Sequence, residues 1–196
     1  MYQRGQPKWN RLPTTHKELI RSELKSEQGY LCCYCERKLE NGDYHIEHIK
    51  PKGLSKYEIY SIEYDNLICS CQLELENGDP RHCGNGKGSW YEEPLFVSPL
   101  DPNCETRFRY TFDGHIQAST DNDNRAQTTI QRLNLNIDKL IALRKAAIDP
   151  FLDDTLSVKE LSDFVNGYLV QKENNNGHYN QFYTTIQDLF VTNHRT

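Results

Sequence analysis

Apolar residues recur at helical spacing in the last third of the chain. After Arg125 they follow one another at intervals of three and four residues, which places them on one face of a helix. The side chains concerned are Ile130, Leu133, Ile137, Leu140 and Ile141, then Leu161, Phe164, Val165 and Leu169, and finally Phe182, Ile186, Leu189 and Phe190. We therefore expect this part of the chain to be helical, with apolar faces that form a core or dock a partner.

A further helix is expected near the beginning of the chain, from Thr15 to Gln28. Thr15 and Glu18 have the spacing of a capping box, in which each side chain satisfies a backbone N–H at the start of the helix. Gly29 stands where a glycine commonly ends a helix. Both ends of this helix are therefore predicted from local signals.

Two segments alternate in the manner of β-strands. Tyr44 to Ile49 follows an Asn41-Gly42 turn signal, and its alternation places Tyr44, Ile46 and His48 on one face. In the second segment an Asp113-Gly114 turn separates two short strands, which predicts a hairpin. Its alternating side chains are Phe108, Tyr110 and Phe112, followed by Ile116 and Ala118.

These elements together predict an α+β fold, with a small ββα centre wrapped by helices. We expect a single domain over 1–196, because this length supports one good hydrophobic core. Within it, residues 30–92 would form a cysteine-rich core, 93–120 a β-hairpin extension and 121–196 a helical C-terminal part. Twelve Tyr, seven Phe and two Trp argue against general disorder.

Charge and hydropathy narrow the function classes. The net charge of −5 counts against tight nucleic-acid binding by the surface as a whole. A local basic strip or a partner could still supply the positive charge that such binding needs. No stretch approaches 18 apolar residues, and the first residues contain no signal-peptide core. We therefore expect a cytoplasmic protein that does not enter membranes.

Seven cysteines in such a protein favour metal ligation over disulfides. A C-x-x-C pair, Cys32 and Cys35, can supply two thiolates from one turn, and Cys71 and Cys83 can close a tetrahedral zinc site. The alternatives are a redox pair or buried thiols that pack as small apolar side chains. Three further cysteines receive no ligand role: Cys33 and Cys69, which we expect to pack, and Cys104.

Glu47 and His48 lie between the two cysteine groups. A carboxylate can bind a hard divalent cation, and an imidazole can remove a proton from water, which together suit phosphodiester hydrolysis. Glu47 needs one further amide or imidazole ligand for such an ion. Read without its context, an adjacent Glu and His is more often an ordinary surface pair.

The order of these parts resembles the zinc-bearing branch of the HNH endonuclease superfamily. The matching motifs are Cys32-x-x-Cys35, Glu47-His48-Ile49-Lys50-Pro51, Asn66-Leu67 and Ser70-Cys71. The resemblance implies that His48 is the general base, that Glu47 binds a catalytic Mg²⁺ or Mn²⁺, and that Asn66 holds the intervening loop. It implies DNA as the substrate. RNA, including tRNA, stays open because such a site acts on the phosphate.

Over residues 30 to 145 the chain is similar to the HNH component of the Septu (PtuB-like) anti-phage systems, which include retron-associated versions. This implies a PtuA-like ABC-type ATPase as partner. The stretch after Cys71 is longer than in compact HNH sites, so the third residue of the catalytic metal site is open. We expect Asn85, with His82 as the alternative.

Other residues near the motif receive simpler interpretations. His45 is expected to face away from His48 and to belong to the core or the surface. Lys87 lacks the spacing of a phosphate-binding loop. Lys50, Lys52 and Lys56 either contact phosphates or form a solvated face. A different class of function, a non-catalytic zinc-knuckle module that binds nucleic acid or protein, would keep the cysteines but need neither Glu47 nor His48.

Overall fold

The computed structural model describes residues 8–40 and 42–192. Its first long element is helix α1, Thr14–Glu27. Pro13 occupies the N-cap position and no side chain caps the helix, so the predicted capping box is wrong. The helix begins one residue earlier than expected, which places Thr15 inside the first turn. The predicted stop is confirmed: the N–H groups of Gly29 and Tyr30 donate to the carbonyls of Ser26 and Lys25, and Gly29 has a φ of +59°.

An antiparallel strand pair lies beside α1. Strand β1, Tyr44–His48, confirms the first predicted strand to within one residue, and it pairs with β2, Leu67–Cys71, so that Tyr44 lies opposite Cys71. All five residues of β2 are buried. Of the turn expected before β1, Gly42 has a φ of +79°, whereas Asn41 lies outside the described residues.

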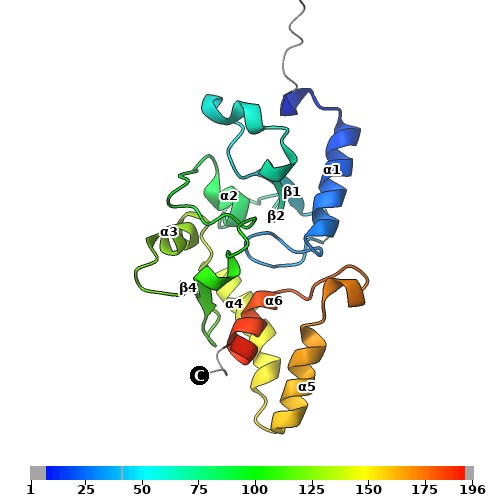
Figure 1. Cartoon of the computed structure of the whole chain (residues 1–196), viewed down its shortest axis with the longest axis vertical. Helices are drawn as coiled ribbons and strands as arrows, with labels where there is room; N and C mark the ends of the chain where they lie inside the picture. The colour runs from blue at the N-terminus through cyan, green and yellow to red at the C-terminus, as the bar shows by residue number, and fades with distance from the viewer. Residues whose placement is uncertain (1–7, 41, 193–196) are drawn as a thin grey trace, which may run out of the picture.

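The connection between β1 and β2 contains two short 3-10 helices, η2 (Ser55–Tyr60) and η3 (Tyr64–Asn66). After β2 the chain returns to the pair through helix α2, Cys83–Lys87, which packs against β2. The order strand, loop, strand and helix therefore brings the cysteine-rich turn, β1, β2 and α2 together (Figure 1).

The predicted second hairpin is confirmed as β3, Phe108–Tyr110, paired antiparallel with β4, Ile116–Ala118. Gly114 in its turn has a φ of +93°, and a side chain there would collide with the backbone carbonyl of Ile141. Glycine therefore allows both the turn and its close approach to the helix that contains Ile141. Phe112, expected to continue the alternation, lies beyond the paired residues and is half exposed.

The helices expected after Arg125 are present. They are α3 (Asn124–Arg132), α4 (Asp138–Ile148), α5 (Val158–Tyr168) and α6 (Tyr183–Gln187), the last followed by a π-helical turn, η7 (Asp188–Thr192). Short 3-10 helices lie at η1 (Trp9–Arg11), η4 (Glu105–Arg107), η5 (Asp149–Leu152) and η6 (Lys172–Asn174). The fold is α+β, as expected.

Two apolar clusters hold these elements. The larger one surrounds β1 and β2 and includes the buried cysteines, whereas the smaller one joins α4, η5, α5 and the last helical turns. The smaller cluster consists of Ile148, Phe151, Val165, Ile186 and Leu189. Among residues 8–40 and 42–192, no helix combines the length and the apolar character needed to cross a membrane.

Candidate functional site

Four cysteines converge beside the strand pair. Cys32 and Cys35 come from the turn before β1, Cys71 ends β2 and Cys83 begins α2, and their Sγ atoms all lie within 4.8 Å of one another. All four are buried. Thiolates around a tetrahedral zinc ion lie about 3.8 Å apart, since each Zn–S distance is about 2.3 Å. The Sγ atoms of Cys35 and Cys71 are 3.8 Å apart, so the cluster fits a metal such as zinc.

The remaining cysteines do not join this cluster. Cys69 is buried in the core on β2, and Cys33 and Cys104 are partly buried. All seven thiols are free. In the described residues the C-x-x-C pair is therefore part of a four-thiol cluster and forms no disulfide.

Glu47 points from β1 towards α2, where Lys87 holds it. The Lys87 Nζ atom donates to Glu47 Oε1 at 2.7 Å and to the carbonyl of His48 at 3.0 Å. The Lys87 side chain is completely buried, and that of Glu47 is 11% exposed. An ion pair with this little access to water has few alternative geometries, so Lys87 fixes the orientation of the carboxylate.

Sequence reasoning missed this role of Lys87 and considered it only for phosphate binding. The signal lies in the spacing: Lys87 follows Cys83 by four residues, which places both on the same face of α2. Cys83 faces the cysteine cluster beside β2. Lys87 therefore has to face the same strand pair.

His45 shares the strand face of Glu47, because residues two apart on a strand point the same way. Its Nε2 atom lies 3.8 Å from Glu47 Oε2. The neighbouring residue of α2 is Gly84, and a Cβ atom built there would lie 2.9 Å from each of these two atoms. His45 is thus part of the surroundings of Glu47, whereas the sequence indicated only that it faces away from His48.

His48 occupies the other side of the strand. Its Nε2 atom is 3.0 Å from the carbonyl oxygen of Ser61, and Trp9 packs edge-on against its ring at 4.9 Å between centroids. A carbonyl oxygen can only accept, which assigns the proton to Nε2 and leaves Nδ1 as a free acceptor. Burial, with the charge of Lys52, lowers the pKa of His48 to about 4. The imidazole is therefore neutral near pH 7.

Asn66 closes the loop that separates β1 from β2. Its Oδ1 atom accepts from the backbone N–H of Lys50 at 2.7 Å, and its Nδ2 atom donates to the carbonyls of Lys50 and Tyr60 at 3.1 and 3.0 Å. The side chain is buried. These three bonds tie the two ends of the loop to each other directly after His48.

The structure brings neither Asn85 nor His82 to Glu47. The Asn85 amide donates to the carbonyl of Gln72, and His82 Nδ1 lies 3.1 Å from the Sγ atom of Cys83. Successive residues of a helix are rotated by about 100°, and here Gly84 is the residue of α2 that faces the carboxylate. His82 precedes the helix and is directed towards the cysteine cluster.

No family model matches the chain. A curated protein of Vibrio cholerae serotype O1 biovar El Tor, "Retron Vc95 putative HNH endonuclease", is 34% identical to it over 138 residues. The chain is similar to an HNH endonuclease. The matched region is 68% of this chain and 65% of the relative, so the chain spans just under two thirds of that protein's length.

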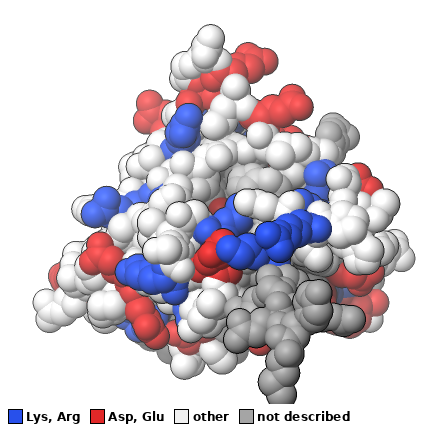
Figure 2. Space-filling view, turned by 90° about the horizontal axis from the view of Figure 1, so that it is seen from above, with Lys and Arg blue, Asp and Glu red and all other residues white. Residues whose placement is uncertain are grey.

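Two lysine side chains lie beside Trp9, the residue that packs against His48. The ammonium groups of Lys17 and Lys52 both lie over the ring of Trp9, at 5.5 and 5.3 Å from its centroid. Figure 2 shows basic side chains in a row across the middle of one face of the molecule, with acidic ones mostly around them. Burial and the nearby charge of Lys17 lower the pKa of Lys52. A local basic strip thus exists on an acidic protein.

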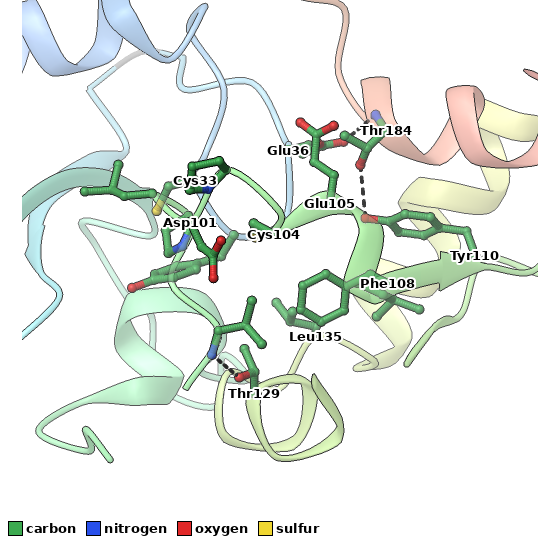
Figure 3. Close-up of a pocket in the computed structure, with 16 residues that line it drawn as sticks. Cys33, Glu36, Asp101, Cys104, Glu105, Phe108, Tyr110, Thr129, Leu135 and Thr184 are labelled. Atoms are coloured by element: carbon green, nitrogen blue, oxygen red, sulfur yellow. Dashed lines mark hydrogen bonds between the residues drawn. The ribbon is translucent and has the colours of Figure 1, made fainter. Parts of the chain in front are cut away.

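A separate cavity of about 380 Å³ lies between the cysteine-rich turn and the second hairpin (Figure 3). Its walls include the thiol-bearing Cys33 and Cys104 and the carboxylate of Glu36, which accepts from the Thr184 N–H at 3.0 Å. Burial raises the pKa of Glu36 to about 7. None of the residues expected to be catalytic lines this cavity, so it is distinct from the surroundings of Glu47 and His48.

Proposed function

We propose that the chain is a metal-dependent HNH endonuclease that hydrolyses phosphodiester bonds in DNA, built on a zinc-containing ββα-metal core. The observation that carries this proposal is the pair Glu47 and His48. One strand presents a carboxylate held by Lys87 on one side and a neutral imidazole with a free Nδ1 atom on the other. The similarity to the retron protein agrees with it.

In this proposal His48 is the general base. Its Nδ1 atom accepts the proton of the attacking water, while the bond from Nε2 to the Ser61 carbonyl holds the ring and supports the positive charge that forms on it. Glu47 binds the catalytic Mg²⁺ or Mn²⁺, and that ion stabilises negative charge on the phosphate and the leaving oxygen when it is bound. Asn66 keeps the loop after His48 in place.

The four cysteines Cys32, Cys35, Cys71 and Cys83 are proposed to hold a structural zinc ion. These four ligands come from three separate segments of the chain. The zinc ion would join the segments on the side of the strand pair that carries α2. Since α2 also supplies Lys87, the zinc site would hold Lys87 against Glu47. Asn85, which the sequence favoured as the further residue of the catalytic metal site, donates to Gln72 and is not used in this proposal.

DNA is proposed as the substrate, bound in part by the lysines around Trp9. Incubation of the purified protein with supercoiled plasmid and with a tRNA transcript, each with Mn²⁺ or Mg²⁺ and with EDTA, tests this choice. We expect nicked and linear plasmid only with the divalent ion, and intact RNA. Cleavage of RNA alone would keep the nuclease and overturn DNA as its substrate.

A PtuA-like ABC-type ATPase is the proposed partner, in an anti-phage defence complex of the Septu type within the cytoplasm. The net charge of −5 supports a nuclease that depends on an assembly for part of its grip on DNA. Co-expression of the two chains and gel filtration test this proposal. We expect both chains in one peak, and separate elution would contradict it.

A non-catalytic zinc-knuckle module is the second candidate, because one observation favours it. His48 is only 5% exposed and Trp9 covers its ring, so the histidine could serve packing alone. This candidate requires that His48→Ala leave every activity of the protein unchanged, whereas the nuclease proposal requires the loss of cleavage.

A further inference from the structure

The carboxylate of Glu47 has one oxygen engaged and one available. Lys87 donates to Oε1, whereas Oε2 faces the imidazole of His45, whose Nε2 atom is 3.8 Å away. The two residues expected to complete a metal site, Asn85 and His82, are directed to Gln72 and to the cysteines. His45, which we expected to belong to the core or the surface, is therefore the imidazole that meets the free oxygen of Glu47.

We propose that His45 is the second protein ligand of the divalent ion bound by Glu47, and that it takes the place of a ligand from α2. Two donors that each lie about 2.1 Å from one ion can be at most about 4.2 Å apart. The separation of 3.8 Å between His45 Nε2 and Glu47 Oε2 lies within this limit. A small turn of either side chain brings both to the same ion.

Gly84 provides the space for that ion. A Cβ atom at this position would lie 2.9 Å from Glu47 Oε2, 2.9 Å from His45 Nε2 and 3.0 Å from Ser70 Oγ. Any other residue would fill the region in front of both donors. Glycine at the start of α2 leaves this region free, and it also means that the helix offers no side-chain ligand there.

The ligand set has a chemical consequence. Mg²⁺ binds oxygen donors almost exclusively, whereas Mn²⁺ and the later divalent metals of the first transition row accept imidazole more readily. One carboxylate and one imidazole therefore favour Mn²⁺ over Mg²⁺. The side chains of His45 and Glu47 are 21% and 11% exposed, which leaves a path for the ion and for a substrate phosphate.

This inference rests on the proposed nuclease site, and direct metal binding tests it without any cleavage assay. Mn²⁺ is titrated into the zinc-loaded protein and followed by electron paramagnetic resonance, and electron spin echo envelope modulation detects a coordinated nitrogen. The wild type is compared with His45→Ala, with Glu47→Gln and with the matched control His115→Ala, which removes a half-exposed histidine beside the Asp113-Gly114 turn. Zinc content and circular dichroism verify that each variant is folded.

We expect a nitrogen modulation from bound Mn²⁺ in the wild type and in His115→Ala. In His45→Ala we expect this modulation to be lost and the affinity for Mn²⁺ to be at least about tenfold lower. Equal affinity and modulation in His45→Ala would overturn the inference. The proposed function would survive that result if Glu47→Gln still lost Mn²⁺, and both would fail if Glu47→Gln bound Mn²⁺ like the wild type. If His45→Ala did not fold, a wild-type spectrum without nitrogen modulation would overturn the inference.

Discussion

Glu47 and His48 are neighbours in sequence with opposite surroundings. The carboxylate is held by a buried ammonium group, and the imidazole is held by a backbone carbonyl and covered by an indole ring. Strand alternation separates them, because consecutive side chains of β1 point to opposite faces. Each of the two adjacent side chains, the Glu47 carboxylate and the His48 imidazole, is therefore held in place by its own set of contacts.

Lys87→Met tests how strongly the ion pair holds Glu47. The substitution leaves a buried carboxylate without its partner, and breaking such a pair costs about 3–5 kcal/mol. We expect urea denaturation to show a loss of this order. Lys87→Met combined with Glu47→Gln removes the unpaired charge and should recover part of it. A single variant as stable as the wild type would show that the pair does not hold the site.

The protonation of His48 provides a second test at this scale. Burial and Lys52 lower its folded pKa from 6.5 to about 4. Between these values the unfolded chain binds a proton that folded His48 does not, so this group lowers the free energy of unfolding as the pH falls from 6.5 to 4. We expect imidazole NMR signals to show a neutral His48 ring at about pH 5.5. Half-protonation near pH 6.5 would contradict the buried environment.

Among the elements, the antiparallel pair β1–β2 and the short helix α2 depend on the cysteine cluster. The four thiols come from the turn before β1, the end of β2 and the start of α2. Helix α2 has only five residues, too few to be stable alone. Metal binding at the cluster would therefore supply much of the free energy that holds α2 against the strands.

Removal of the metal by a chelator under reducing conditions should open this region first. We expect hydrogen exchange to accelerate in β1, β2 and α2, whereas α5 and the last helical turns keep their protection longer, because the second apolar cluster contains no cysteine. Mass spectrometry of the exchanging peptides measures both regions in one sample. Unchanged exchange in β1 and β2 after complete zinc loss would show that the cluster is not structural.

Elements with a repeated pattern could be predicted from the sequence, and contacts between distant segments could not. The apolar periodicity of Ile130 and Leu133 and the turn at Asp113-Gly114 gave helices and a hairpin that the structure contains. The cysteine spacing predicted a cluster of four thiols, and these four thiols converge in the structure. The partners of Glu47 were missed, because the rotation of α2 about its own axis decides whether Gly84 or Asn85 faces the carboxylate. The sequence indicates that angle only through Cys83, whose side chain has to face the cysteine cluster.

At the scale of the whole molecule, the distribution of charge matters more than its sum. The chain carries a net charge of −5, yet the ammonium groups of Lys17 and Lys52 both lie over the ring of Trp9, which packs against the ring of His48. Burial lowers the pKa of Lys52, and repulsion by the ammonium group of Lys17 lowers it further. A phosphate brought near His48 would relieve their repulsion.

Lys17→Gln combined with Lys52→Gln tests this basic strip. If each lysine contacts one phosphate, the double variant should bind duplex DNA more weakly, and the slope of log K against log salt should fall by about 2. Fluorescence anisotropy at several salt concentrations measures both quantities in the presence of EDTA. Lys159→Gln, on the exposed face of α5, is the matched control. An unchanged slope would show that DNA phosphates do not contact Lys17 and Lys52.

Cleavage of supercoiled plasmid with Mn²⁺ by the wild type and by His48→Ala, with zinc measured in both proteins, tests the central claim most directly. His115→Ala is the matched control, and each protein is assayed alone and with its proposed ATPase partner. The account predicts cleavage by the wild type and the control, and a loss of at least about 100-fold in His48→Ala at unchanged zinc content. Equal cleavage by His48→Ala would contradict the assignment of His48 as the catalytic base.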